Sequence, residues 1–135
     1  MTNLPDPMDG FSSALTFSGI DWLQVPDTPG VYVIYDLQEV LYVGMAGRDK
    51  GGSLKRLRDH VTGQVVNMFA QYLFLARVQF ATSERIAHPR DAKAACKAYI
   101  HERCSFRFRS FSSAVDARLV EADLKRRLSP ALNAG

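Results

Sequence analysis

The sequence predicts an α/β domain of the α+β kind, in which a small and mainly antiparallel sheet is flanked by helices. Two runs rich in Val, Leu, Ile and Tyr, residues 30–36 and 40–47, are separated by only three residues. This pattern is typical of two strands joined in an antiparallel hairpin. Apolar residues also recur at helical spacing over residues 89–103 and 116–128, which indicates two amphipathic helices.

Length and composition indicate one folded domain. The chain has 135 residues, and 47% of them are apolar, enough to bury a core and too many for a disordered chain. We expect a tail and a short packing element over residues 1–25 and a single domain over 26–135. The formal net charge of +3 is compatible with a nucleic-acid partner, although many proteins of this charge bind none.

The chain has two cysteines, Cys96 and Cys104, and their spacing fits no common zinc pattern. We interpret them as reduced thiols. No apolar run approaches the roughly 20 residues that cross a bilayer, and the acidic, proline-bearing N-terminus is unlike a signal peptide. The expectation is a soluble cytoplasmic protein without a membrane partner.

Residues 11–25 precede the hairpin and carry scattered apolar side chains. We expect them to pack a short element against the sheet. Trp22 could stack on a nucleobase, but a single Trp beside Leu23 is more often part of a core.

A glycine-rich, basic loop over residues 47–52 follows the hairpin and includes Arg48 and Lys50. Backbone N–H groups of such a loop can bind a phosphate, although a flexible connector has the same composition. The Walker pattern is absent. Ser53 is a suitable N-cap for the helix expected next.

This helix, residues 53–61, is basic and includes Lys55 and Arg58. Arg56 and His60 are four residues apart, so they share one face of the helix. A solvated helix face would carry similar charges.

Further along, residues 72–80 are typical of a buried strand. Residues 105–111 alternate aromatic and basic side chains, which predicts a strand with Phe106 and Phe108 on one face and Arg107 and Arg109 on the other. Such arginines can contact phosphates and such aromatics can stack on bases. More often the phenylalanines are simply core.

The last helix is expected to begin at Ser112 or Ser113 and to end before Pro130. Glu121 lies beside its apolar stripe and is therefore expected to be partly buried. A buried carboxylate requires a partner or a metal. The alternative is an exposed glutamate that pairs with Lys125, four residues later.

Taken in order, these residues resemble the GIY-YIG nuclease superfamily. The tripeptide GVY at 30–32 is similar to the first half of the name motif, and YVG at 42–44 is similar to the second, each with Val in place of Ile. Arg56 and His60 fall where the family has its helix arginine and a His or Tyr one turn later. The resemblance implies a stand-alone catalytic domain built on a three-stranded sheet.

The resemblance continues near the C-terminus. Glu121, Pro130 and Asn133 are similar to the family's metal-binding glutamate, its proline and its terminal asparagine. The two similar parts span residues 30–60 and 121–133, and the residues between them carry no family motif.

The resemblance implies a metal-dependent endonuclease that hydrolyses phosphodiester bonds in DNA. One Mg²⁺ or Mn²⁺ ion on Glu121 would stabilise charge on phosphorus and on the departing 3′ oxygen. Arg56 offers a forked, permanently charged donor to the phosphoryl oxygens. Tyr32 is the implied base for water. The pKa of a free tyrosine is about 10, so ionising Tyr32 near pH 7 requires about 4 kcal/mol of stabilisation of its phenolate.

The resemblance implies supporting roles for other residues. Tyr42 orients the water or the scissile phosphate, and His60 holds a tyrosine or a phosphate or accepts a proton. Asn133 orients the substrate or Glu121. The implied substrate-binding set is Gly44, Arg48, Lys50, Lys55, Arg58 and Asn133.

One residue departs from the family pattern. Met45 follows the second motif glycine, where many relatives have Lys or Ser. The loss of a charge here suggests an alternative, a DNA-binding module of the same fold with weak or no activity. A stand-alone nuclease domain would take its specificity from a homodimer, from a partner protein or from the segment around residues 82–89.

Overall fold

The structure is a computed structural model. It describes residues 8–47, 54, 57, 73, 77 and 89–132. Within them, no helix is long and apolar enough to cross a membrane.

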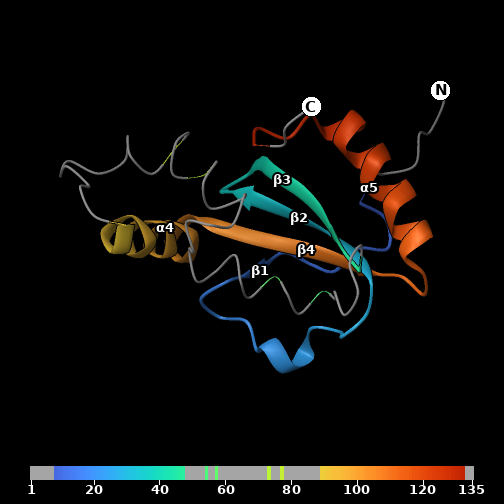
Figure 1. Ribbon diagram of the computed structural model, residues 1–135, viewed down its shortest axis with the longest axis horizontal. Coiled ribbons are helices and arrows are strands. Elements are labelled where there is room, and N and C mark those ends of the chain that lie inside the picture. Colours follow the sequence, from blue (N-terminus) through green and yellow to red (C-terminus); the bar gives the residue numbers. More distant parts are fainter. Residues whose placement is uncertain are drawn as a thin grey trace.

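Four antiparallel strands form a sheet in the order β1-β4-β2-β3 (Figure 1). The strands are β1 (Leu15–Thr16), β2 (Gly30–Asp36), β3 (Glu39–Ala46) and β4 (Cys104–Ser110). Helix α4 (Pro89–Arg103) packs against β4, and helix α5 (Ala114–Leu128) packs against β3 and β2. The α+β class is confirmed, but the sheet has one strand more than expected, because the short β1 pairs with β4.

The predicted hairpin is formed by β2 and β3. Asp36 pairs with Glu39, so the turn has two residues rather than the three expected. Leu37 has a φ of 55°, and its N–H donates to the carbonyl oxygen of Arg103 at 2.9 Å. This bond attaches the turn to the end of α4.

A bulge in β3 changes which side chains face each side of the sheet. Ile34 pairs with Tyr42 and Tyr35 pairs with Val40, so Leu41 has no cross-strand partner of its own. Leu41 and Tyr42 therefore pack on the same face, although they are adjacent in the sequence.

The helices predicted over 89–103 and 116–128 are present, and the predicted strand over 105–111 corresponds to β4 with a shift of one residue. Of the helix predicted over 53–61, only Leu54, in a 3-10 turn, and Leu57, in a helix, are described, and the rest of that prediction lies outside the described residues. The N-terminal element packs on the sheet as expected, since β1 joins it and a 3-10 turn, η1 (Trp22–Gln24), is followed by the buried Val25. The side chain of Trp22 lies outside the described part. The strand predicted over 72–80 is wrong at Leu73 and Arg77, which are both helical. The apolar character of this run satisfies burial, as Leu73 is fully buried, without requiring a strand.

Strand alternation gives the sheet two apolar faces. One face carries the tyrosine-side core, which consists of Phe17, Val25, Tyr32, Ile34, Leu41, Ala46, Leu54, Leu57, Leu73, Cys96, Tyr99, Ile100, Cys104, Phe106 and Leu132. The other carries the α5-side core, which consists of Met8, Val31, Val33, Val43, Ala117 and Leu124.

Both cysteines are buried free thiols in the tyrosine-side core. Burial raises the pKa of Cys96 to about 11 and that of Cys104 to about 12, so both remain protonated at neutral pH.

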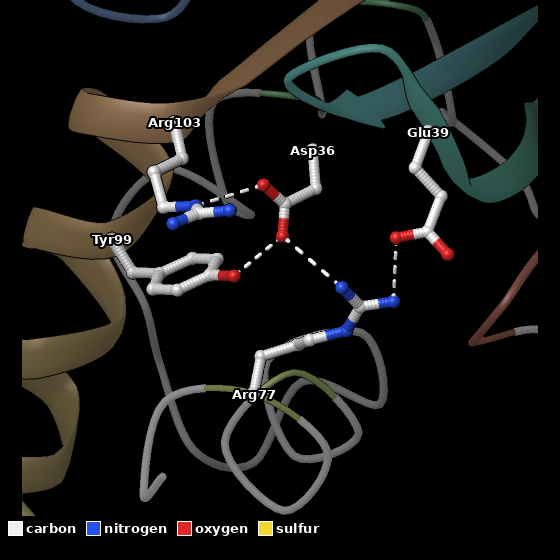
Figure 2. Close-up of polar contacts among 5 residues, drawn as sticks. All are labelled: Asp36, Glu39, Arg77, Tyr99 and Arg103. Carbon is white, nitrogen blue, oxygen red and sulfur yellow. Dashed lines mark hydrogen bonds and ion pairs between the residues drawn. The ribbon is translucent and has the colours of Figure 1, made fainter. Parts of the chain in front are cut away.

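A buried carboxylate holds the hairpin to the rest of the domain (Figure 2). The side chain of Asp36 is 1% exposed. It accepts hydrogen bonds from the Tyr99 hydroxyl and, at 2.9 Å, from Nε of Arg103. Arg77 lies 3.5 Å from the same carboxylate and 2.8 Å from that of Glu39. Asp36 thus joins α4, the hairpin turn and Arg77 in one polar network.

We expect Asp36→Asn to lower the free energy of unfolding by about 3 kcal/mol, because it removes the buried charge that the Tyr99 hydroxyl, Arg103 and Arg77 bind. Urea unfolding followed by circular dichroism would measure the change. The matched control is Asp123→Asn, which breaks the exposed ion pairs to Arg126 and Arg127 on α5 and should cost less than about 1 kcal/mol. An equal loss of unfolding free energy in the two variants would contradict a special role for the buried Asp36 carboxylate.

Burial, together with the hydrogen bond to Asp36, raises the pKa of Tyr99 to about 12. Because the folded state favours the neutral phenol, its stabilising contribution is complete below about pH 10 and is lost as the pH rises through about 12. An absorbance titration of the wild type should contain a step near pH 12 that Tyr99→Phe lacks. A step near pH 10 instead would show that the hydroxyl is not held by Asp36.

Candidate functional site

Tyr32 and Tyr42 lie side by side on neighbouring strands. Both side chains pack on the tyrosine-side core, and their rings stack with centroids 6.2 Å apart and an interplanar angle of 25°. Tyr32 is 7% exposed, whereas Tyr42 is half-buried. The hairpin thus brings the two motif tyrosines together, and Tyr42 is the one more open to solvent.

The glycine of the second motif makes room for the tyrosine of the first. Gly44 pairs with Tyr32 across the strands, and a Cβ on Gly44 would lie 2.5 Å from both Cζ and the hydroxyl oxygen of Tyr32. Any side chain at position 44 therefore requires the Tyr32 ring to move. Packing alone explains this pairing of Tyr and Gly, so the two tripeptides do not by themselves identify an activity.

Gly30, the glycine of the first motif, also has no room for a side chain. A Cβ there would lie 2.6 Å from the carbonyl oxygen of Arg109 on β4 and 2.6 Å from Cδ1 of Leu54. The first motif glycine therefore permits the close approach of Leu54 to the start of β2, and the Leu54 N–H donates to the Thr28 carbonyl at 2.9 Å.

Leu54 and Leu57 attach the segment after the hairpin to the tyrosines. Both are almost completely buried and belong to the tyrosine-side core together with Tyr32. In the sequence they flank Arg56. Apart from Glu121, the remaining predicted site residues lie outside the described residues, namely Arg48, Lys50, Lys55, Arg56, Arg58, His60 and Asn133.

Glu121 is buried on α5. Ser113 caps this helix, its hydroxyl oxygen accepting from the Asp116 N–H at 3.2 Å, as the sequence predicted. Ala117 and Leu124 lie on the same helix face as Glu121 and insert into the α5-side core, which leaves the Glu121 side chain only 7% exposed. Its carboxylate lies 3.7 Å from Lys125 Nζ. The expected burial is confirmed, and the alternative pair with Lys125 forms as well.

Helix α5 and the two tyrosines pack on opposite faces of the sheet, and β3 connects the two faces. After α5 ends, the chain runs along β3, with the N–H groups of Ala131 and Leu132 donating to the carbonyls of Val40 and Leu41 at 3.3 and 2.9 Å. Leu132 then enters the tyrosine-side core. The segment after Glu121 therefore crosses the edge of β3 and ends beside the tyrosine face.

The carboxylates of the described part suit only one kind of metal site. No three His, Cys, Asp or Glu side chains gather there closely enough to enclose an ion. A single buried carboxylate such as Glu121 fits a hard cation that keeps waters or substrate oxygens in its remaining positions. Lys125 would have to share or release this carboxylate. Among the described residues, this donor set fits Mg²⁺ or Mn²⁺ held by one carboxylate and does not fit an ion enclosed by protein ligands alone.

Sequence reasoning missed the role of Asp36 and overlooked where Met45 points. Asp36 ends an apolar strand and precedes the turn, which gave it the pattern of an exposed turn residue. Tyr99, Arg103 and Arg77, which bind its carboxylate, lie far away in the sequence. No local pattern therefore pointed to this role. Met45 pairs with Val31 and packs on the α5-side core, away from the tyrosines.

We expect Gly44→Ala to lower the free energy of unfolding by about 1 to 3 kcal/mol, because the added methyl group overlaps the Tyr32 ring. A double-mutant cycle with Tyr32→Ala would measure the coupling by urea unfolding. In the Tyr32→Ala background, Gly44→Ala should cost much less. The same cost in both backgrounds would show that the ring does not restrict position 44.

Two comparisons with known proteins place the chain in no group. The chain matches no protein-family model, and the search of curated proteins found no match. An assignment of function therefore depends on the residues and the geometry described above.

Proposed function

We propose that this protein is a metal-dependent endonuclease of the GIY-YIG type that hydrolyses phosphodiester bonds in DNA. The observation that carries the proposal is that three of the motif segments, those of Tyr32, Arg56 and Asn133, contribute buried residues to one core, while Glu121 lies on the opposite face of the sheet. Tyr32 shares the tyrosine-side core with Leu57 and with Leu132. In the sequence Leu57 follows Arg56 directly, and Leu132 directly precedes Asn133.

This convergence is more specific than the tripeptides. The packing of Tyr32 on Gly44 needs only two strands, and many hairpins can supply them. The segments around Arg56 and Asn133 are far apart in the sequence, yet buried leucines beside both belong to the same core as Tyr32. A site built from two strand tyrosines, an arginine and an asparagine requires this arrangement.

In the proposed site, the scissile phosphate lies beside β3. This strand carries Tyr42 and Gly44, and α5 with Glu121 packs on it from the other face. The first half of the strand edge is occupied by Ala131 and Leu132. The second half, toward Ala46, is therefore the part that a DNA backbone would approach.

Each residue has a chemical role in the proposal. Tyr32 takes a proton from the attacking water, and Tyr42, the more exposed ring, orients that water or the phosphate. Arg56 and His60 bind the phosphoryl oxygens. Glu121 holds the divalent cation, which supplies charge stabilisation for the departing 3′ oxygen when bound. The basic residues Arg48, Lys50, Lys55 and Arg58 contact the flanking phosphates.

Two observations favour a second candidate, a DNA-binding module of this fold without turnover. Tyr32 is 7% exposed, so little of the proposed base is open to water. Met45 is apolar and packs on the opposite face, so this position adds no positive charge at the tyrosines. Such a module would bind DNA with an affinity that falls as salt rises and would cleave nothing.

We expect the wild-type protein to nick supercoiled plasmid in the presence of Mg²⁺ or Mn²⁺ and to stop when EDTA is added. Glu121→Gln and Arg56→Gln should each lower the nicking rate at least about a hundredfold, because each removes a group that stabilises charge in the transition state. Agarose gel electrophoresis of the plasmid forms measures the rate.

The matched controls are Glu102→Gln and Arg118→Gln, which remove the same charges from exposed positions on α4 and α5. Both should nick like the wild type. Nicking that survives Glu121→Gln and Arg56→Gln would refute the site. An absence of nicking, with salt-sensitive DNA binding retained, would support the binding module instead.

A further inference from the structure

Two arginines of β4 point to the same face of the sheet as α5. Arg107 pairs with Val33 and Arg109 with Val31, and both valines belong to the α5-side core. Alternate residues of a strand lie about 6.8 Å apart. Because α5 packs on β3 and β2, this arginine pair lies beyond the helix on that face.

Neutral groups hold both side chains in place. Nε of Arg107 donates to the Ser12 carbonyl at 2.8 Å. Ser12 is itself fixed on β4, since its N–H donates to the Phe108 carbonyl at 2.8 Å and its hydroxyl accepts from the Phe108 N–H at 3.0 Å. The Arg109 guanidinium lies 4.8 Å from the centre of the Phe111 ring, a cation–π contact.

Neither guanidinium is neutralised within the described part of the chain, where no carboxylate lies within 4.0 Å of Arg107 or Arg109. This distinguishes them from Arg103 and Arg77, which bind Asp36, and from Arg126, which binds Asp123. Arg107 and Arg109 are nevertheless half-buried. Half-buried cations without an anion are unfavourable, so this pair is suited to an anion from outside the chain.

We propose that Arg107 and Arg109 form a second DNA-contacting surface, which binds backbone phosphates that flank the cleavage site. The proposal rests on the proposed function, because it assigns a further part of the same substrate to this face. Guanidinium groups are forked donors that match phosphate oxygens, and their spacing along β4 lets them contact different phosphates of one strand. The hydrogen bond to the Ser12 carbonyl uses only Nε of Arg107. The two terminal nitrogens of its guanidinium are left for the phosphate contact.

The experiment measures binding of a short, fluorescently labelled DNA duplex by anisotropy, in EDTA and between about 50 and 200 mM salt. The Arg107→Gln/Arg109→Gln double variant should weaken binding at least about tenfold and lower the salt slope of log K by about 2. Arg107→Lys/Arg109→Lys retains both charges and should keep most of the slope.

The matched control is Arg126→Gln/Arg127→Gln, which makes the same change in net charge on α5, where both arginines bind Asp123. Its salt slope should stay within about half a unit of the wild type. Equal losses in both double variants would overturn the proposal in favour of a general charge effect. An unchanged slope in Arg107→Gln/Arg109→Gln, with thermal unfolding as in the wild type, would also overturn it, as would no binding of the duplex by the wild type.

The binding measurement is independent of catalytic turnover, because DNA binding in EDTA requires no cleavage. Plasmid nicking that depends on Glu121, combined with normal binding by Arg107→Gln/Arg109→Gln, would leave the nuclease intact and remove this surface. The reverse result, no nicking but binding that depends on the arginine pair, would remove the nuclease and keep the surface.

Discussion

The domain depends most on the charge of one buried carboxylate. Asp36 stands at the end of β2 with its side chain 1% exposed, where an uncompensated charge would be strongly destabilising. Tyr99 and Arg103 from α4, together with Arg77, compensate it. These contacts hold α4 at the turn of the hairpin, where the Leu37 N–H also donates a hydrogen bond to the Arg103 carbonyl oxygen. The two strands that carry Tyr32 and Tyr42 are thereby fixed at their turn end.

At the other end of the hairpin, shape rather than charge sets the geometry. Gly44 admits the Tyr32 ring, and Gly30 admits Leu54 and the backbone of β4. The segment after the hairpin can therefore pack onto the tyrosines through Leu54 and Leu57. Regular alternation places Tyr42 on the same face as Tyr32, and the bulge adds Leu41 to that face. The two glycines and the strand register therefore let Leu54 and Leu57, which flank Arg56 in the sequence, share one core with the tyrosines.

Local patterns in the sequence predicted most elements of the fold. Alternation and β-propensity gave β2, β3 and β4 within one residue of their bounds, and helical spacing with the Ser113 cap gave α4 and α5. The strand expected over 72–80 failed at Leu73 and Arg77 because a short apolar run indicates burial without specifying its backbone. The two-residue β1 was missed because its place is decided by pairing with β4, about ninety residues later.

By itself, the sequence determined the α+β class, the hairpin, the capped last helix and the burial of Glu121, since each follows from residues close together along the chain. Only the tertiary structure decided which distant groups meet. It placed Asp36 among Tyr99, Arg103 and Arg77 (Figure 2), and within the described part of the chain it left Arg107 and Arg109 with no carboxylate within 4.0 Å. The physical reason is that side-chain partners across a sheet are set by register and helix packing, which no local pattern encodes.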